Sequence, residues 1–83
     1  MTEAEIIRRG EAARAFRDNP LTVELFAEVE RETMEQWALS QPPDTVERES
    51  CYFQLRVLGA LKSKLANWAY DGAEAMKRRT NNL

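Results

Sequence analysis

The chain of 83 residues contains no histidine and a single cysteine, Cys51. Without histidine it lacks the commonest general base and metal ligand, and neither a Cys–His nor a Ser–His pair can form within one chain. The neighbours of Cys51, which include Glu49 and Ser50, bring no positive charge that would favour a reactive thiolate. We therefore expect a protein that is not an enzyme and that uses no metal and no cofactor.

Glycine and proline are also sparse, with three residues of each. Gly10, Gly59 and Gly72 are far apart, so no glycine-rich phosphate-binding loop is present. One cysteine cannot form an intrachain disulfide, and a free thiol fits a reducing compartment. No uncharged apolar run approaches the ~18 residues of a membrane span, and the first residues lack the apolar run of an export signal. These absences predict a cytoplasmic protein with no membrane partner.

Two of the three prolines lie together in the segment 40–44, between two amphipathic stretches. A short proline-containing connection between two such stretches predicts an antiparallel helical hairpin. Its helices are expected at about 20–39 and 45–70, the second with an extension to about 79. A shorter helix is expected before them, at about 3–16. The sequence thus predicts one all-α domain over residues 1–83.

The expected helix ends rest on a few polar residues, glycine and proline. Asn19 before Pro20 ends the first helix and begins the second, because Asn is a good N-cap and proline suits the first helical position. Asp44 with Glu47 resembles a capping box at the start of the third helix. The pair at 71–72, Asp-Gly, predicts an end or bend of that helix, and residues 80–83 are expected to fray.

Apolar residues recur at helical spacing in each stretch. The first stretch has Ile6, Gly10, Ala13 and Phe16 on one face. The second has a core stripe of Leu25, Phe26, Val29, Thr33 and Trp37. The third has Cys51, Leu55, Leu58, Leu61, Leu65 and Trp68. We expect Trp37 to be a core residue, whereas Trp68 fits a core position and an exposed anchor equally well.

The third stretch is apolar over more than one face, because Phe53 and Val57 lie off its main stripe. A domain this small is only marginally stable alone, so a second apolar face predicts association with another copy or another protein. The residues expected to anchor such an association are Phe53, Val57, Trp68, Tyr70 and Met76.

The formal net charge of −2 conceals an asymmetry along the chain. Residues 18–49 carry nine acidic and two basic side chains, whereas residues 50–83 carry six basic and two acidic ones. An acidic helix packed beside a basic one would modestly stabilise the hairpin. The acidic row is a solvated face or a partner-binding surface rather than a metal site, and comprises Glu24, Glu28, Glu32 and Glu35. The basic end, which complements a helix C-terminus or contacts phosphates, comprises Lys77, Arg78 and Arg79.

A series of residues resembles a pattern in small helical proteins of tailed bacteriophages. The pattern has an Asn-Pro helix start, a phenylalanine, a tryptophan, a proline-containing loop and an Arg-Glu-x-x-Tyr-x-x-Leu helix. It is matched in order by Asn19-Pro20, Phe26, Trp37, Pro42-Pro43, Arg48-Glu49, Tyr52 and Leu55. The resemblance covers residues 17 to about 65. It implies a phage setting and a structural or packaging role, and it transfers no catalytic residue.

Three hypotheses about function follow. The first is a non-enzymatic helical interaction protein, a phage virion-assembly or packaging component that acts as a homo-oligomer. The second is a host-directed phage inhibitor whose acidic second helix binds a basic surface of a host protein. The third is a nucleic-acid-binding packaging accessory that uses the basic end of the third helix. Each places the protein in the host cytoplasm, and the first also allows incorporation in a virion.

Overall fold

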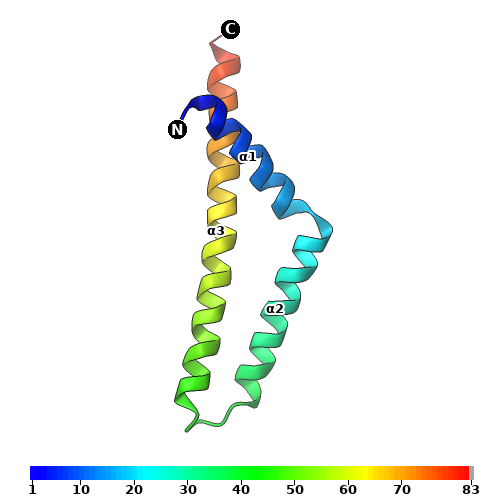
Figure 1. The fold of residues 1–83 in the computed structure, drawn as a ribbon, viewed down its shortest axis with the longest axis vertical. Helices are drawn as coiled ribbons and strands as arrows, with labels where there is room; N and C mark the ends of the chain where they lie inside the picture. The colour runs from blue at the N-terminus through cyan, green and yellow to red at the C-terminus, as the bar shows by residue number, and fades with distance from the viewer. Residues whose placement is uncertain (83) are drawn as a thin grey trace.

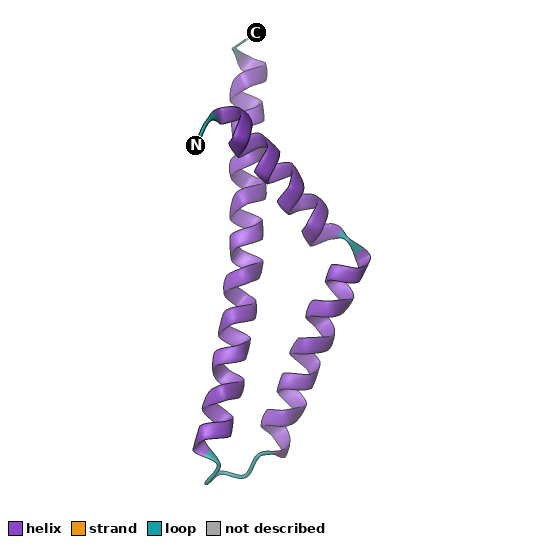
Figure 2. Cartoon of the chain, viewed as in Figure 1, coloured by secondary structure: helices purple, strands orange, loops and turns teal. Residues whose placement is uncertain are grey.

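A computed structural model describes residues 1–82 of the chain. The described residues form three α-helices and no strand: α1 (Glu3–Asp18), α2 (Pro20–Leu39) and α3 (Thr45–Asn81) (Figure 2). The prediction of an all-α protein is therefore confirmed. Helix α3 runs the length of the molecule, α2 lies antiparallel beside its N-terminal half, and α1 crosses its C-terminal half (Figure 1).

The turn between α1 and α2 is a single residue, Asn19. Its backbone is extended, at φ −63° and ψ 127°, as expected before proline. Its side-chain oxygen accepts a hydrogen bond from the Leu21 amide at 2.8 Å, which confirms the predicted N-cap of α2. Its own amide donates to the Phe16 carbonyl, so the same residue also ends α1. Helix α1 consequently continues to Asp18, two residues beyond the predicted end.

The loop between α2 and α3 is held by its own polar contacts. The predicted capping box of Asp44 and Glu47 is wrong, because the Asp44 side chain accepts from the Gln41 amide at 3.0 Å instead of capping α3. Arg48 donates to the Ser40 hydroxyl at 3.1 Å and so ties the start of α3 back to the end of α2. The loop thus sets the separation of the two helices at this end of the molecule.

Gly72 neither ends nor bends α3, which corrects the predicted boundary near residue 70. Helix α3 is 37 residues long and continues through Gly72 to Asn81, which confirms the predicted extension to residue 79. A Cβ built on Gly72 would lie 2.8 Å from the Cα of Gly10, so this glycine instead allows α1 to cross at very short range. Thr80 and Asn81 are helical rather than frayed, and Leu83 lies outside the described residues.

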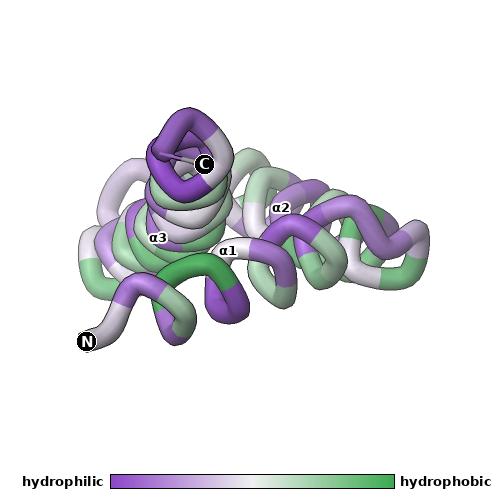
Figure 3. Tube along the Cα trace, turned by 90° about the horizontal axis from the view of Figure 1, so that it is seen from above, coloured by the Kyte–Doolittle hydropathy of each residue, from purple (hydrophilic) through white to green (hydrophobic). Residues whose placement is uncertain are grey.

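The buried core of the chain is small. Within residues 1–82 its apolar members are Ile7, Ala13, Cys51 and Ala75. Several predicted core residues are exposed instead, namely Phe16, Leu25, Trp37 and Leu61, with Trp37 at 42%. The reason is the arrangement of the helices. Figure 3 shows α2 beside α3 and α1 across one face of α3, which leaves the hairpin near the loop without a covering element.

Candidate interaction surface

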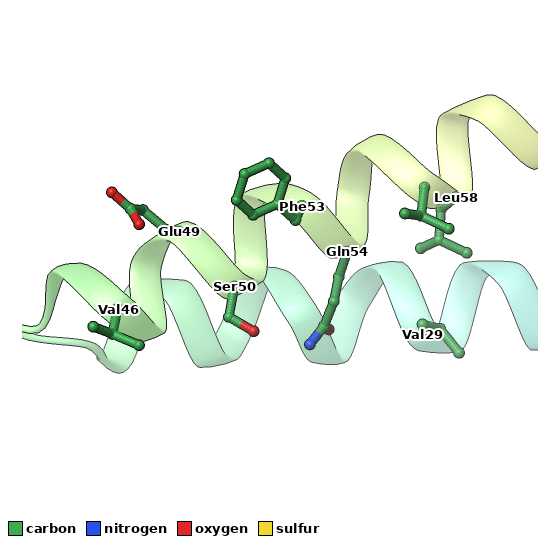
Figure 4. A pocket seen from close by; sticks show the side chains of 8 residues that line it. Val29, Val46, Glu49, Ser50, Phe53, Gln54 and Leu58 are labelled. Atoms are coloured by element: carbon green, nitrogen blue, oxygen red, sulfur yellow. The ribbon is translucent and has the colours of Figure 1, made fainter.

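An apolar groove lies between α2 and α3 near the loop end of the molecule, with a volume of about 690 Å³. Its apolar residues are Val29 from α2 and Val46, Phe53, Val57 and Leu58 from α3. We call it the α2–α3 groove. Figure 4 shows Leu58 and Val29 facing each other across it, while Phe53 projects from the outer side of α3. Most of the residues that line the groove are apolar.

Helical spacing brings the α3 residues of the groove together. Val46, Phe53 and Val57 are separated by seven and four residues, which places them on one side of a helix. The exposed fractions of Phe53 and Val57 are 63% and 58%. Exposed apolar residues that occur singly are normal on protein surfaces, whereas a contiguous set of this kind indicates an interaction site.

Polar contacts join α2 and α3 in addition to apolar side chains such as the half-buried Leu55 and Leu58. The buried Thr33 hydroxyl donates to the Val29 carbonyl at 2.8 Å and lies 3.2 Å from the Gln54 side-chain oxygen. Figure 4 shows Gln54 pointing toward α2. Phe53 and Val57, on the adjoining side of α3, are exposed.

The predicted attraction between an acidic and a basic helix has a small part in this joint. Within residues 1–82 one ion pair joins α2 to α3, between Lys62 and Glu30 at 3.0 Å. Both side chains are about half exposed, so this pair contributes little to stability. The strongly basic end of α3 lies beyond α2, where α1 crosses, and so does not meet the acidic helix of its own chain.

The structure brings two of the five predicted anchor residues together and separates the rest. Phe53 and Val57 share the α2–α3 groove. Trp68 is half-buried, with the Arg9 guanidinium 4.6 Å from its ring centroid. Tyr70 is exposed and, two residues on, faces the other side of α3. Met76 lies in a second hollow, at the crossing of α1 and α3.

Sequence reasoning missed three residues of the groove as partner-facing positions: Val46, and Val29 and Leu58, which were expected only in the core. Val46 is the second residue of α3 and belongs to none of the apolar stripes predicted from helical spacing. Its spacing to Phe53 and Val57 was the signal that could have revealed it. Val29 was assigned to the core of the hairpin, and its position at the groove depends on how far α2 and α3 stand apart.

The acidic row on α2 is exposed, and two of its four carboxylates share one arginine. Arg31 lies between its members and pairs with Glu28 at 2.8 Å and with Glu35 at 2.7 Å. The hydrogen bond from Arg31 lowers the pKa of Glu28 below its ordinary value. Glu24 and Glu32 are exposed as well. No group of three or more histidine, cysteine or carboxylate side chains within residues 1–82 is placed to hold a metal ion.

The basic end of α3 is exposed at one tip of the molecule. Lys77 lies 3.6 Å from Glu74, and Arg78 and Arg79 stand in the last turn, where positive charge is favoured by the helix dipole. The neighbouring arginines of α1 are partly engaged, since Arg9 stacks on Trp68 and Arg17 pairs with Asp18 at 3.0 Å. The three C-terminal basic residues therefore place positive charge where the dipole of α3 favours it.

No helix within residues 1–82 combines the length and the apolar character needed to cross a lipid bilayer. No family model, curated protein or solved structure matches the chain.

Proposed function

We propose that the protein is a non-enzymatic helical interaction protein that acts as a homo-oligomer, and that it serves as a virion-assembly or packaging component of a tailed phage in the host cytoplasm. The observation that carries the first part is the accessible surface of the folded chain, 6393 Å². A monomeric globular protein of 9.6 kDa exposes about 5,100 Å². The chain therefore exposes far more surface than a self-contained domain of its mass.

The dimensions of the molecule lead to the same conclusion. Its radius of gyration is 17.7 Å, whereas a compact domain of this length has about 12 Å. Its extents of 62 × 23 × 15 Å describe a flat, elongated body. Such a body has too little interior to bury its apolar residues. A second layer of helices from another copy would bury them.

The location of the exposed apolar residues supports association rather than a loosely folded chain. Three of them, Val46, Phe53 and Val57, line the α2–α3 groove. This groove lies beside polar contacts that join the two helices, such as Thr33–Gln54 and Arg48–Ser40. The phage setting rests on the resemblance over residues 17 to about 65. A helical oligomer without catalytic residues is suited to a structural role in such a particle.

Light scattering of the purified protein over a series of concentrations tests this function. The expected result is a discrete mass that is a multiple of 9.6 kDa. A mass of one chain at every concentration, up to the millimolar range, would contradict self-association. Detection of the protein in purified virions, or its co-purification with capsid or portal proteins, tests the assembly role separately.

The exposed carboxylates of α2 favour a second candidate, a host-directed inhibitor that binds a basic surface of a host protein. Electrostatic complementarity of this kind steers association and is weakened by salt. Arg31 already forms ion pairs with two of the four carboxylates, Glu28 and Glu35. The attraction to a basic surface of the host protein would therefore come from Glu24 and Glu32. Reversal of both to lysine should abolish capture of the host protein from an extract, and unchanged capture would reject this mechanism.

A further inference from the structure

Building on the proposed self-association, we infer that the α2–α3 groove is covered by a second copy of this chain in antiparallel orientation. The two α3 helices would pack against each other about a twofold axis near Val57. This assignment names the partner, its direction and its register. It rests on a seam of residues along α3 and on the charges at the two ends of that seam.

The seam comprises Glu49, Phe53, Val57, Ala60 and Lys64. Their spacings of four, four, three and four residues keep them on one side of α3, as in the contact line of two packed helices. Phe53 and Val57 line the α2–α3 groove, and together with Ala60 they line a smaller hollow on the adjoining surface of α3. The centre of the seam is thus apolar and exposed.

Opposite charges close the seam at its two ends. Among residues 1–82, neither Glu49 nor Lys64 forms an ion pair. They are 15 residues apart, or about 22 Å along the helix. In an antiparallel pair with its axis midway, each Glu49 meets the partner's Lys64, and the contact occurs twice. A parallel pair would instead place Glu49 against the partner's Glu49 and Lys64 against the partner's Lys64.

Side-chain size along the seam fits the same register. An axis midway between residues 49 and 64 places Phe53 opposite the partner's Ala60 and Val57 beside the partner's Val57. A large side chain then meets a small one, as interdigitated packing requires. Arg56 flanks the axis and, with Tyr52, lines the same hollow as Phe53, Val57 and Ala60. Its guanidinium lies over the Tyr52 ring, 5.9 Å from the centroid.

Charge and area both favour a second copy as the occupant. In the antiparallel register each Glu49 meets the partner's Lys64, so unlike charges come together at both ends of the seam. A stable interface removes about 800 Å² from each partner. The surface of 6393 Å² exceeds that of a compact monomer by about 1,300 Å², which is enough for such an interface.

A charge exchange tests the orientation. We expect Glu49→Lys and Lys64→Glu each to raise the dissociation constant of the dimer about tenfold, because each replaces two attractive contacts by two repulsive ones. The double variant should return to within about threefold of the unmodified protein. Glu3→Lys makes the same change of charge on α1, away from the seam, and should leave the dissociation constant unchanged.

Each outcome of the exchange decides a question. If the unmodified protein is a monomer, the proposed function fails and this inference fails with it. Suppose that it is a dimer whose dissociation constant is unchanged in both single variants, or is raised in the double variant by the product of the two single effects. In either case the antiparallel seam is wrong, while self-association stands. Circular dichroism of each variant verifies that the helices are intact.

Oxidative crosslinking gives an independent readout that does not depend on charge. Val57→Cys lies at the axis and should form a disulfide between copies, whereas Val46→Cys, on the same side of α3 but three residues before the seam begins, should not. A parallel dimer would crosslink at both positions, and absence of crosslinking at residue 57 would reject the register. Cys51 is fully buried and should not crosslink. The unmodified protein, which contains only this cysteine, is therefore the control.

Discussion

Gly10 and Gly72 face each other where α1 crosses α3, and a Cβ built on Gly10 would lie 2.7 Å from the Cα of Gly72. The same Cβ would lie 2.7 Å from the carbonyl oxygen of Trp68. Both neighbours are backbone atoms, which cannot move aside as the end of a flexible side chain can. The closeness of the two helices therefore depends on the absence of a side chain at both positions.

Substitution of Gly10 by alanine should lower the free energy of unfolding by about 1–3 kcal/mol, the usual effect of overpacking a tight contact. The loss arises because α1 must move away from α3 to accommodate one methyl group. Thermal or urea unfolding followed by circular dichroism, at a fixed protein concentration, measures it.

Gly59→Ala is the matched control for this change. Gly59 also lies within α3, but apart from its chain neighbours and the adjacent backbone of α3, no atom of the described chain lies within 4 Å of a Cβ built there. Alanine should raise the free energy of unfolding by about 0.5–1 kcal/mol through its higher helix propensity. If Gly10→Ala were also stabilising, the close crossing of α1 and α3 would not exist in solution.

Phe53→Ser should convert the oligomer to single chains in light scattering. Each copy would lose one large apolar side chain from the contact, which weakens a symmetric dimer at least about 100-fold. Tyr70→Ser is the control, because Tyr70 is an equally exposed aromatic residue on another side of α3. The interaction surface is misplaced if the Tyr70 variant dissociates and the Phe53 variant does not.

Arg31→Gln should raise the pKa of Glu28 toward its ordinary value, because the hydrogen bond and the positive charge that lower it both come from Arg31. In the unmodified protein this pair contributes stability above the ordinary glutamate pKa, about 4.3, and loses it as the pH falls through the lowered folded value. The pair is exposed, so the contribution is small. Carboxylate titration by NMR checks the shift, and an unchanged pKa in the variant would exclude Arg31 as its cause.

Asn19→Ala should lower the free energy of unfolding by about 1 kcal/mol, because the Leu21 amide at the start of α2 loses its acceptor. Asn19→Ser restores an acceptor of similar reach and should recover most of the loss. Equal stability of the serine and alanine variants, measured by urea unfolding at one concentration, would mean that the cap has no role.

The helices were largely predictable because their ends depend on local chemistry. Asn19 before Pro20 and the prolines at 42 and 43 act through their own backbone and the adjacent amides, so their effect can be inferred from a few residues. Gly72 could not be interpreted in this way. Its role depends on Gly10, which is 62 positions away in the sequence, and a glycine that breaks a helix looks identical to one that allows a close crossing.

Burial was harder to predict than helix position. Helical spacing shows which residues share a face, but it does not show whether that face meets the same chain, another chain or water. Trp37 and Leu25 were expected in the core for this reason, yet both are exposed, whereas Thr33 of the same stripe is buried. Of the predicted anchors, Phe53 and Val57 were brought together because they belong to the same side of one helix.

The junction at Asn19 gives the molecule a hinge of one residue. Because α1 ends and α2 begins at the same residue, the direction of α2 relative to α1 depends on two backbone rotations. Helix α2 is about 30 Å long, so a rotation of about 10° there would displace its far end by about 5 Å. The loop and the Arg48–Ser40 and Thr33–Gln54 contacts hold that far end of α2 against α3, so the α2–α3 groove keeps its width only while these contacts oppose rotation at Asn19.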